Sequence, residues 1–177
     1  MMPAALFPSL MGDSFASLDE GVRAVHGGQG RTWSGTASVE RGRGVFVPLL
    51  ARMAGLPPTQ RRVRVQVEIH SSATGEEWAR NFGDAPVMRS SLRARDGLLE
   101  ERLGWVVLRF RLHAQQGGVH WQLVRLSLGP IPLPVRLFAV TAQSLPGPSG
   151  YRFVVAARIA GIGELIRYDG DLEVAHE

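Results

Sequence analysis

The sequence contains no cysteine and no lysine, and each absence removes a class of chemistry. Without cysteine, the chain has no disulfide, no thiolate metal site and no cysteine nucleophile. All 20 basic side chains are arginine, which excludes a Schiff-base lysine and the lysine of a phosphate-binding loop. The formal net charge is only +4, so charge alone gives little reason to expect nucleic-acid binding.

Long apolar runs are also missing. No stretch approaches the roughly 18–20 residues that a membrane-spanning helix needs. Met1–Met11 lacks the basic start and long apolar centre of a signal peptide, so we expect a cytoplasmic protein. The length of 177 residues and the apolar content of 45% suit one folded domain over residues 1–177.

Most of the chain alternates between apolar and polar residues, which is the pattern of strands with one buried face. In residues 62–70, valine or isoleucine occupies every second position. Short turns separate such segments, among them Asp96–Gly97, a two-residue hairpin signal. About ten strands with hairpin-length connections predict a mainly β fold: an antiparallel meander forming an up-and-down barrel or half-barrel.

An N-terminal helix is predicted before the first strand. Ser17–Glu20 fits a capping box, and Leu18, Val22 and Val25 then share one helical face. His26 follows near the end of this helix, where we interpret it as a cation that interacts favourably with the helix C-terminus.

A second helix is predicted between the first and second strands, over Val45–Leu56. Arg52 is its one charged residue, and the rest is apolar on every side. Such a helix is buried, or it binds a membrane or a partner. Three placements therefore remain open: a core helix packed on the sheet, a lid over an apolar cavity, or peripheral contact with a membrane or partner, where Arg41, Arg43 and Arg52 favour an anionic surface.

Several short segments spread over nearly the whole chain form a further pattern. They are VRAVHGG (22–28), WSGTASVERGRG (33–44), LLARMAGLPP (49–58), EEWARNFG (76–83), SSLRARDGLLEERLG (90–104), GPIPLP (129–134) and IRYDGDL (166–172). Together they resemble the bacterial family catalogued as domain of unknown function 4166. The resemblance implies no established activity and no catalytic residues. Members are often fused to a saccharopine-dehydrogenase-like, nucleotide-binding domain, which implies an oxidoreductase domain as a partner.

The alternation, carried through each turn, predicts which side chains point into the barrel. In the first hairpin we expect Trp78 opposite Val67 and Phe82 opposite Val63, which turns Arg80 inward as well. A later hairpin places Glu101 opposite Leu92. The inward tryptophans are Trp33, Trp78 and Trp121, and the inward polar residues are Arg80, Glu101, Arg125, Glu164 and Tyr168.

Charges are seldom buried without partners, because the loss of hydration costs several kcal/mol per ion. Arg80 and Glu101 lie on strands that flank a third one, close enough for an arginine to span. Two interpretations are open: a structural ion pair, or a polar anchor at the bottom of a ligand cavity.

Other chemistry finds less support in the sequence. His113 and His120 are predicted neighbours across the Gly117–Gly118 turn, but two imidazoles alone do not make a zinc site, so we expect no metal. No serine has a motif that places a histidine beside it, and we expect no cofactor. An outward arginine patch without aromatic residues is interpreted as a solvated face rather than a nucleic-acid site. Its members are Arg89, Arg93, Arg95 and Arg102.

The leading hypothesis is a non-catalytic module that binds a hydrophobic or amphipathic small molecule inside the barrel. A second is a protein-interaction or regulatory domain that docks a nucleotide-dependent oxidoreductase. A third is an enzyme that uses Arg80, Glu101 and Tyr168. For the first hypothesis the predicted ligand-binding residues are Trp33, Trp78, Arg80, Glu101, Trp121, Arg125 and Tyr168.

Overall fold

The alternating segments form the strands of one antiparallel sheet. The computed structural model describes residues 5–28 and 30–174, and within them the sheet has eleven strands. The strands are β1 (Thr32–Arg41), β2 (Gln60–Ser72), β3 (Gly75–Phe82), β4 (Met88–Arg95), β5 (Leu98–Leu103), β6 (Val106–Gln115), β7 (Gly118–Leu128), β8 (Ile131–Leu133), β9 (Phe138–Leu145), β10 (Gly150–Ile159) and β11 (Gly163–Glu173).

Ten of these strands close into a barrel, since β1 pairs with β11 and β7 pairs with both β6 and β9. The short strand β8 pairs only with β7, through which it extends one side of the wall. Between β7 and β9 the ladder contains just two residue pairs, Val119 with Ser144 and His120 with Gln143. The prediction of an antiparallel meander barrel is thus confirmed, and the closed form is the one that occurs.

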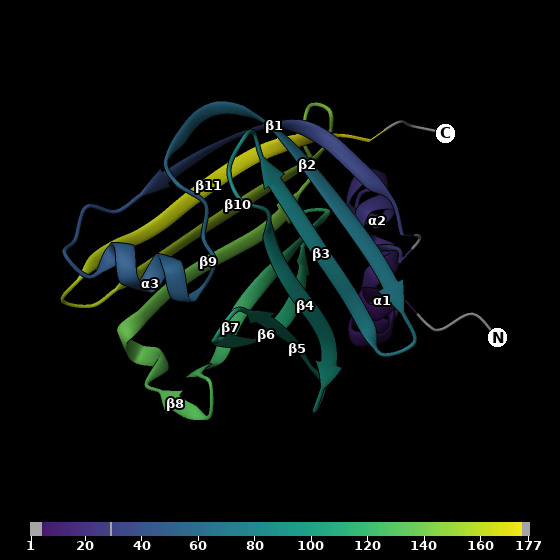
Figure 1. Ribbon diagram of the computed structural model, residues 1–177. Helices are drawn as coiled ribbons and strands as arrows, with labels where there is room; N and C mark the ends of the chain where they lie inside the picture. The colour runs from purple at the N-terminus through teal and green to yellow at the C-terminus, as the bar shows by residue number, and fades with distance from the viewer. Residues whose placement is uncertain (1–4, 29, 175–177) are drawn as a thin grey trace.

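Helices occupy the two ends of the barrel (Figure 1). One end holds α1 (Leu6–Met11), the 3-10 turn η1 (Gly12–Ser17) and α2 (Glu20–His26), and the other holds α3 (Val47–Met53). A second 3-10 turn, η2 (Val135–Leu137), leads into β9. In the described ranges, no helix has the length and apolar character to cross a membrane.

The N-terminal helices close their end of the barrel with apolar side chains. Phe7 and Val22 are fully buried, and Leu18 and Val25 nearly so. The cap of α2 differs from the predicted capping box: the side chain of Asp19, not that of Ser17, accepts a hydrogen bond from the Gly21 amide, at 3.0 Å. This packing extends the barrel core into the helices.

The apolar helix α3 has two different faces. Val47 and Ala51 are buried, and Leu50 and Met53 line the interior cavity described below. Phe46 and Leu49, on the outer side, are each 60% exposed. The helix therefore lies across the barrel end rather than on the wall, and it leaves an apolar surface toward solvent.

The first hairpin differs in register from the prediction without changing the inward face. Trp78 pairs with Ile69, and Phe82 pairs with Val65. The turn uses only the two residues between Ser72 and Gly75, which is shorter than the sequence indicated. A shift of two residues preserves the side-chain alternation, so Arg80 still points inward. The predicted pairing of Glu101 with Leu92 is confirmed.

Two β-bulges reverse the predicted orientation of charged residues. Between β6 and β7, Arg109 pairs with Arg125 while Phe110 pairs with Leu123, so Val124 is an extra residue. Arg125 is consequently exposed, and the prediction that it points inward is wrong.

The second bulge, in β11, adds Leu165 between Glu164 and Ile166. Glu164 then lies on the outer face, where it accepts a hydrogen bond from the Arg167 guanidinium at 3.2 Å. Its predicted inward position is wrong as well.

Candidate functional site

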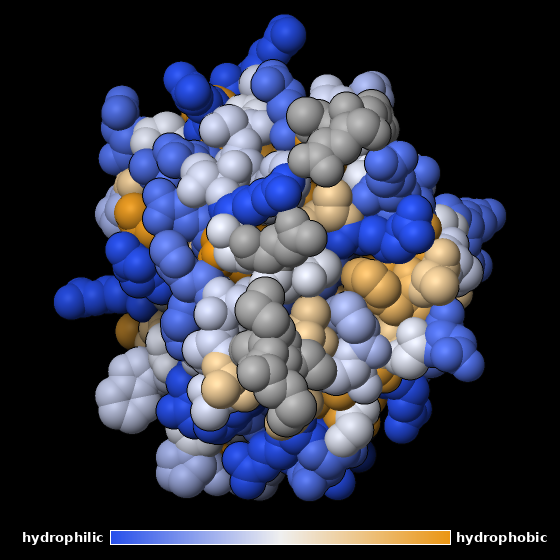
Figure 2. All heavy atoms as spheres, turned by 90° about the vertical axis from the view of Figure 1, so that its right-hand side faces the viewer, coloured by the Kyte–Doolittle hydropathy of each residue, from blue (hydrophilic) through white to orange (hydrophobic). Residues whose placement is uncertain are grey.

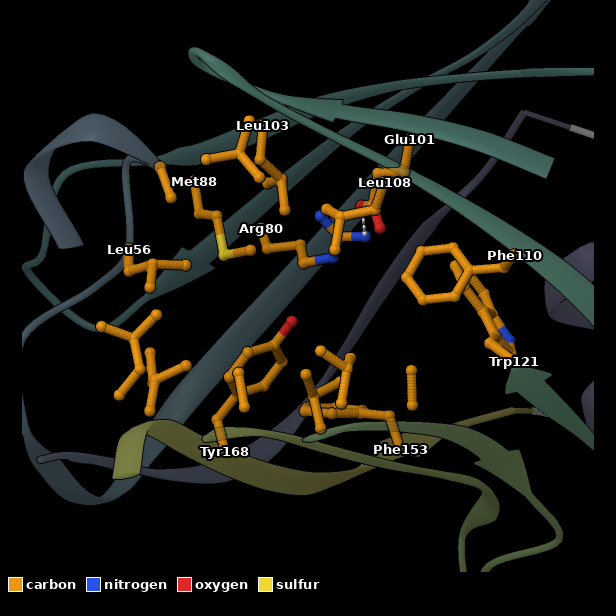
Figure 3. Close-up of a pocket in the computed structure, with 18 of the residues that line it drawn as sticks. Leu56, Arg80, Met88, Glu101, Leu103, Leu108, Phe110, Trp121, Phe153 and Tyr168 are labelled. Carbon is orange, nitrogen blue, oxygen red and sulfur yellow. Dashed lines mark hydrogen bonds and ion pairs between the residues drawn. The ribbon is translucent and has the colours of Figure 1, made fainter. Parts of the chain in front are cut away.

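The interior of the barrel is not completely filled. A cavity of about 300 Å³ runs along it from α2 to α3, within the range of cavities that hold small ligands. Its walls come from every strand between β2 and β11 and from both helical ends. Figure 3 shows side chains from opposite walls converging on it.

The half of the cavity next to α3 is entirely apolar. Leu50, Met53 and Leu56 close it from the helix side, and Leu103 and Val106 contribute from the β5–β6 hairpin. These positions follow from the alternation of each strand, which directs every second residue inward. This half can hold hydrocarbon and offers no polar partner.

The middle of the cavity carries an ion pair. The Arg80 guanidinium donates a hydrogen bond to Glu101 Oε1 at 3.2 Å and another to Ser90 Oγ at 2.9 Å. It also lies over the Trp78 ring, 4.9 Å from the ring centroid. Both charged side chains are about nine-tenths buried, and they neutralise each other inside the barrel.

Polar atoms of this central group are left over for another molecule. Glu101 Oε2 and the Tyr168 hydroxyl have no hydrogen-bond partner among the described residues, and both side chains line the cavity. Tyr168 reaches toward Arg80 from the opposite wall (Figure 3). Burial raises the pKa of Tyr168 to about 12, so the hydroxyl stays protonated and can donate.

The end of the cavity near α2 has a hydrogen-bonded floor that the sequence analysis missed. The Tyr151 hydroxyl donates to Ser144 Oγ at 2.9 Å, and Ser144 Oγ lies 2.9 Å from His26 Nε2. Nothing in the local sequence indicated this group, since its members are up to 125 residues apart. The alternation of β9 and β10 alone could have indicated that Ser144 and Tyr151 point into the barrel.

His26 is therefore not the helix-terminal cation that its position predicted. It is fully buried, with its ring 4.1 Å from that of Phe7, and desolvation, reinforced by the Arg80 charge, lowers its pKa to about 3. In the described residues its Nδ1 has no partner. A serine beside a neutral imidazole resembles part of a catalytic triad, but the carboxylate that would orient the ring is missing from this part of the structure.

Glu76 is a further inward carboxyl that sequence reasoning overlooked. It is 3% exposed, and its Oε2 accepts a hydrogen bond from Trp78 Nε1 at 2.8 Å. Burial raises the pKa of Glu76, although the Trp78 bond acts in the opposite direction. The alternation that turns Trp78 and Arg80 inward also places Glu76 there, so the pattern contained this information.

The predicted ligand-binding residues are only partly brought together. Trp78, Arg80, Glu101, Trp121 and Tyr168 all line the cavity. Trp33 is buried in the core but lies outside the cavity lining. Arg125 lies on the outside of the barrel, as described above.

The outward arginine patch is partly neutralised. Glu100, on the outer face of β5, accepts hydrogen bonds from Arg93 at 2.6 Å and from Arg109 at 2.8 Å. Burial acts to raise the pKa of Glu100, but these two arginines outweigh it and hold the pKa below its ordinary value. His113 and His120 are cross-strand neighbours as predicted. No set of three potential metal ligands gathers anywhere in residues 5–28 and 30–174.

Comparison with known proteins identifies the family. The model of the family described as domain of unknown function (DUF4166) matches residues 18–172, which span the barrel and α2. The chain belongs to this family, as its sequence segments indicated. No protein of curated function and no solved structure matches it.

Proposed function

We propose that this family member binds an amphipathic small molecule inside its barrel, with the apolar part of the ligand toward α3. The observation that carries the proposal is the cavity of about 300 Å³ whose polarity changes along its length. Apolar side chains alone line the half at α3, and the Arg80–Glu101 pair with Tyr168 lies deeper. A ligand with one polar end and one hydrocarbon end matches both parts.

The central group favours a ligand whose polar end is uncharged. Arg80 is already neutralised by Glu101, so a ligand carboxylate would have to displace that carboxylate from its guanidinium. A hydroxyl, carbonyl or amide needs no such displacement, because the Tyr168 hydroxyl donates and Glu101 Oε2 accepts. Burial of the hydrocarbon part supplies the affinity, and these few polar atoms supply the orientation.

The direct test is native mass spectrometry of the protein purified from cells, followed by extraction and identification of any bound molecule. A matched pair of variants makes the test specific. Ala157 lines the cavity and Ala156 is its neighbour on the outer face of β10, so Ala157→Phe fills the cavity and Ala156→Phe does not.

We expect the wild type and Ala156→Phe to carry the same ligand and Ala157→Phe to lose it. Binding of the neutral fluorophore N-phenyl-1-naphthylamine should be retained in Ala156→Phe and lost in Ala157→Phe. Tyr168→Phe should weaken binding of the natural ligand more than binding of the fluorophore, which needs no polar partner. Unaltered ligand content in a folded Ala157→Phe variant would refute the proposal.

A further inference from the structure

The barrel end at α3 carries every large apolar side chain that is strongly exposed in the described part of the chain. We call these residues the apolar rim: Val45, Phe46, Leu49, Val87, Trp105, Ile131 and Leu137. They belong to the β1–β2, β3–β4, β5–β6 and β7–β9 connections. In an antiparallel meander, alternate connections lie at the same end, so these four share one end of the barrel.

Backbone hydrogen bonds join three of the four rim connections: β1–β2, β5–β6 and β7–β9. The Trp105 amide donates to the Met53 carbonyl at the end of α3, and the Gly129 amide donates to the Trp105 carbonyl at 2.7 Å. The Ala160 amide, in the β10–β11 turn, donates to the Leu137 carbonyl at 2.8 Å. These bonds fix the three connections relative to α3. Trp105, at 68% exposed, lies on its β5–β6 corner.

The opposite end of the barrel differs in both polarity and charge. None of the rim residues lies there, and Figure 2, which faces it, shows mainly hydrophilic and neutral surface with apolar surface in patches. At that end the helical segment and the β4–β5 turn carry four acids against two arginines: Asp13, Asp19, Glu20 and Asp96 against Arg23 and Arg31. The rim connections, all of them described, carry Arg43, Arg52 and Arg136, with Asp84 as the one acid. The two ends thus differ in the sign of their charge.

We propose that the apolar rim docks on the surface of a phospholipid membrane that contains anionic lipids. Exposed apolar patches of this kind mark interaction sites. Side chains on separate connections around one end can enter the headgroup region together, and tryptophan favours that depth. Arg43, Arg52 and Arg136 beside them then meet anionic headgroups.

The position of the cavity agrees with such an orientation. Leu50 and Met53, on the inner side of α3, line the cavity, while Phe46 and Leu49 on its outer side belong to the rim. Docking would bring the apolar half of the cavity to the bilayer, with only α3 between them. The proposal of docking is based on the apolar rim and its charge alone. Transfer of a ligand past α3 would additionally depend on the proposed function.

The test is binding of the intact protein to vesicles of phosphatidylcholine, with and without roughly one-third phosphatidylglycerol. Tryptophan fluorescence reports on the rim directly, because Trp33, Trp78 and Trp121 are buried and only Trp105 is strongly exposed. We expect a blue shift of the emission with the anionic vesicles, absent in Trp105→Phe.

Trp105→Ser should lower the partition coefficient about tenfold, through the lost apolar area. The pair Arg43→Gln with Arg52→Gln should lower binding to anionic vesicles and reduce its dependence on salt. The control is Arg111→Gln on the outer wall of β6, which should bind like the wild type. Thermal unfolding checks that each variant is folded.

Three results would overturn docking: no binding to anionic vesicles at low salt, equal binding by wild type and Trp105→Ser, or a dimer that Trp105→Ser dissociates. Binding of an oxidoreductase domain to the rim, without binding of any vesicle, would also overturn membrane docking. Ligand content separates this failure from that of the proposed function. A ligand retained without vesicle binding refutes docking alone, and vesicle binding without any ligand refutes the cavity proposal alone.

Discussion

Removal of one partner from the Arg80–Glu101 pair should destabilise the barrel far more than removal of both. The two side chains are about nine-tenths buried and 3.2 Å apart. Breaking a buried pair leaves one uncompensated charge, which costs about 3–5 kcal/mol, whereas replacement of both by apolar residues is often nearly neutral. The variants are Arg80→Met, Glu101→Leu and their combination.

The structure predicts that the two single variants lose different amounts of unfolding free energy. After Glu101→Leu, Arg80 keeps its hydrogen bond to Ser90 and its position over the Trp78 ring, so the cost falls near the lower figure, about 3 kcal/mol. After Arg80→Met, Glu101 has no other hydrogen-bond donor among the described residues, so the cost approaches about 5 kcal/mol. This second variant should regain stability as the pH falls, because a carboxyl without its cation can take up a proton.

The double variant should cost about 1 kcal/mol, mainly from the Ser90 hydroxyl that loses its donor. Urea unfolding of all four proteins, at pH 5 and pH 8, gives the free energies of unfolding and the coupling between the two sites. Small and additive effects would show that the two charges are solvated and independent. The assignment of a buried central pair would then be incorrect.

Two further predictions concern the other buried titratable groups. His26 has an ordinary pKa of 6.5 in the unfolded chain and about 3 in the folded one, so stability is complete above pH 6.5 and falls as the pH drops toward 3. The loss of unfolding free energy amounts to about 2 kcal/mol by pH 5 and should be absent in His26→Gln. Urea unfolding at pH 5 and at pH 8 measures it. For Glu76 the sign is opposite: burial raises its pKa above the ordinary 4.5, so stability falls as the pH rises above that value. Because His26 acts in the opposite direction over this range, the test uses the His26→Gln background. There, Glu76→Gln should remove the fall in a thermal-unfolding series from pH 4.5 to pH 7, and an unaltered slope would contradict the assignment.

The inward faces of the strands could be predicted because alternation survives errors in register. Trp78 and Phe82 each pair two residues away from the expected partner, yet both are buried as predicted. A register shift of two residues leaves each side chain on the same face of the sheet. One extra residue in a strand moves the side chains beyond it to the opposite face. Arg125 and Glu164 were misplaced for that reason, since Val124 and Leu165 look like ordinary strand residues in the sequence.

The polar floor of the cavity was beyond prediction for a different reason. His26 comes from α2, and Ser144 and Tyr151 come from β9 and β10, so only the closure of the barrel brings them together. The last turn of a helix usually meets solvent, which made a charged His26 the natural expectation. Its actual burial depends on how α2 packs against β10, a contact that local sequence does not encode.

The narrow ladder between β7 and β9 makes the barrel wall unequal around its circumference. Elsewhere in the barrel neighbouring strands share five or more residue pairs, but Val119–Ser144 and His120–Gln143 are all that join these two. Both pairs lie at the α2 end, so from Phe138 to Ala142 the β9 backbone has no ladder partner on β7. Separation of the two strands at the α3 end breaks no sheet hydrogen bond between them. At this seam, therefore, side-chain packing sets the spacing of β7 and β9 near α3, and backbone hydrogen bonds set it near α2.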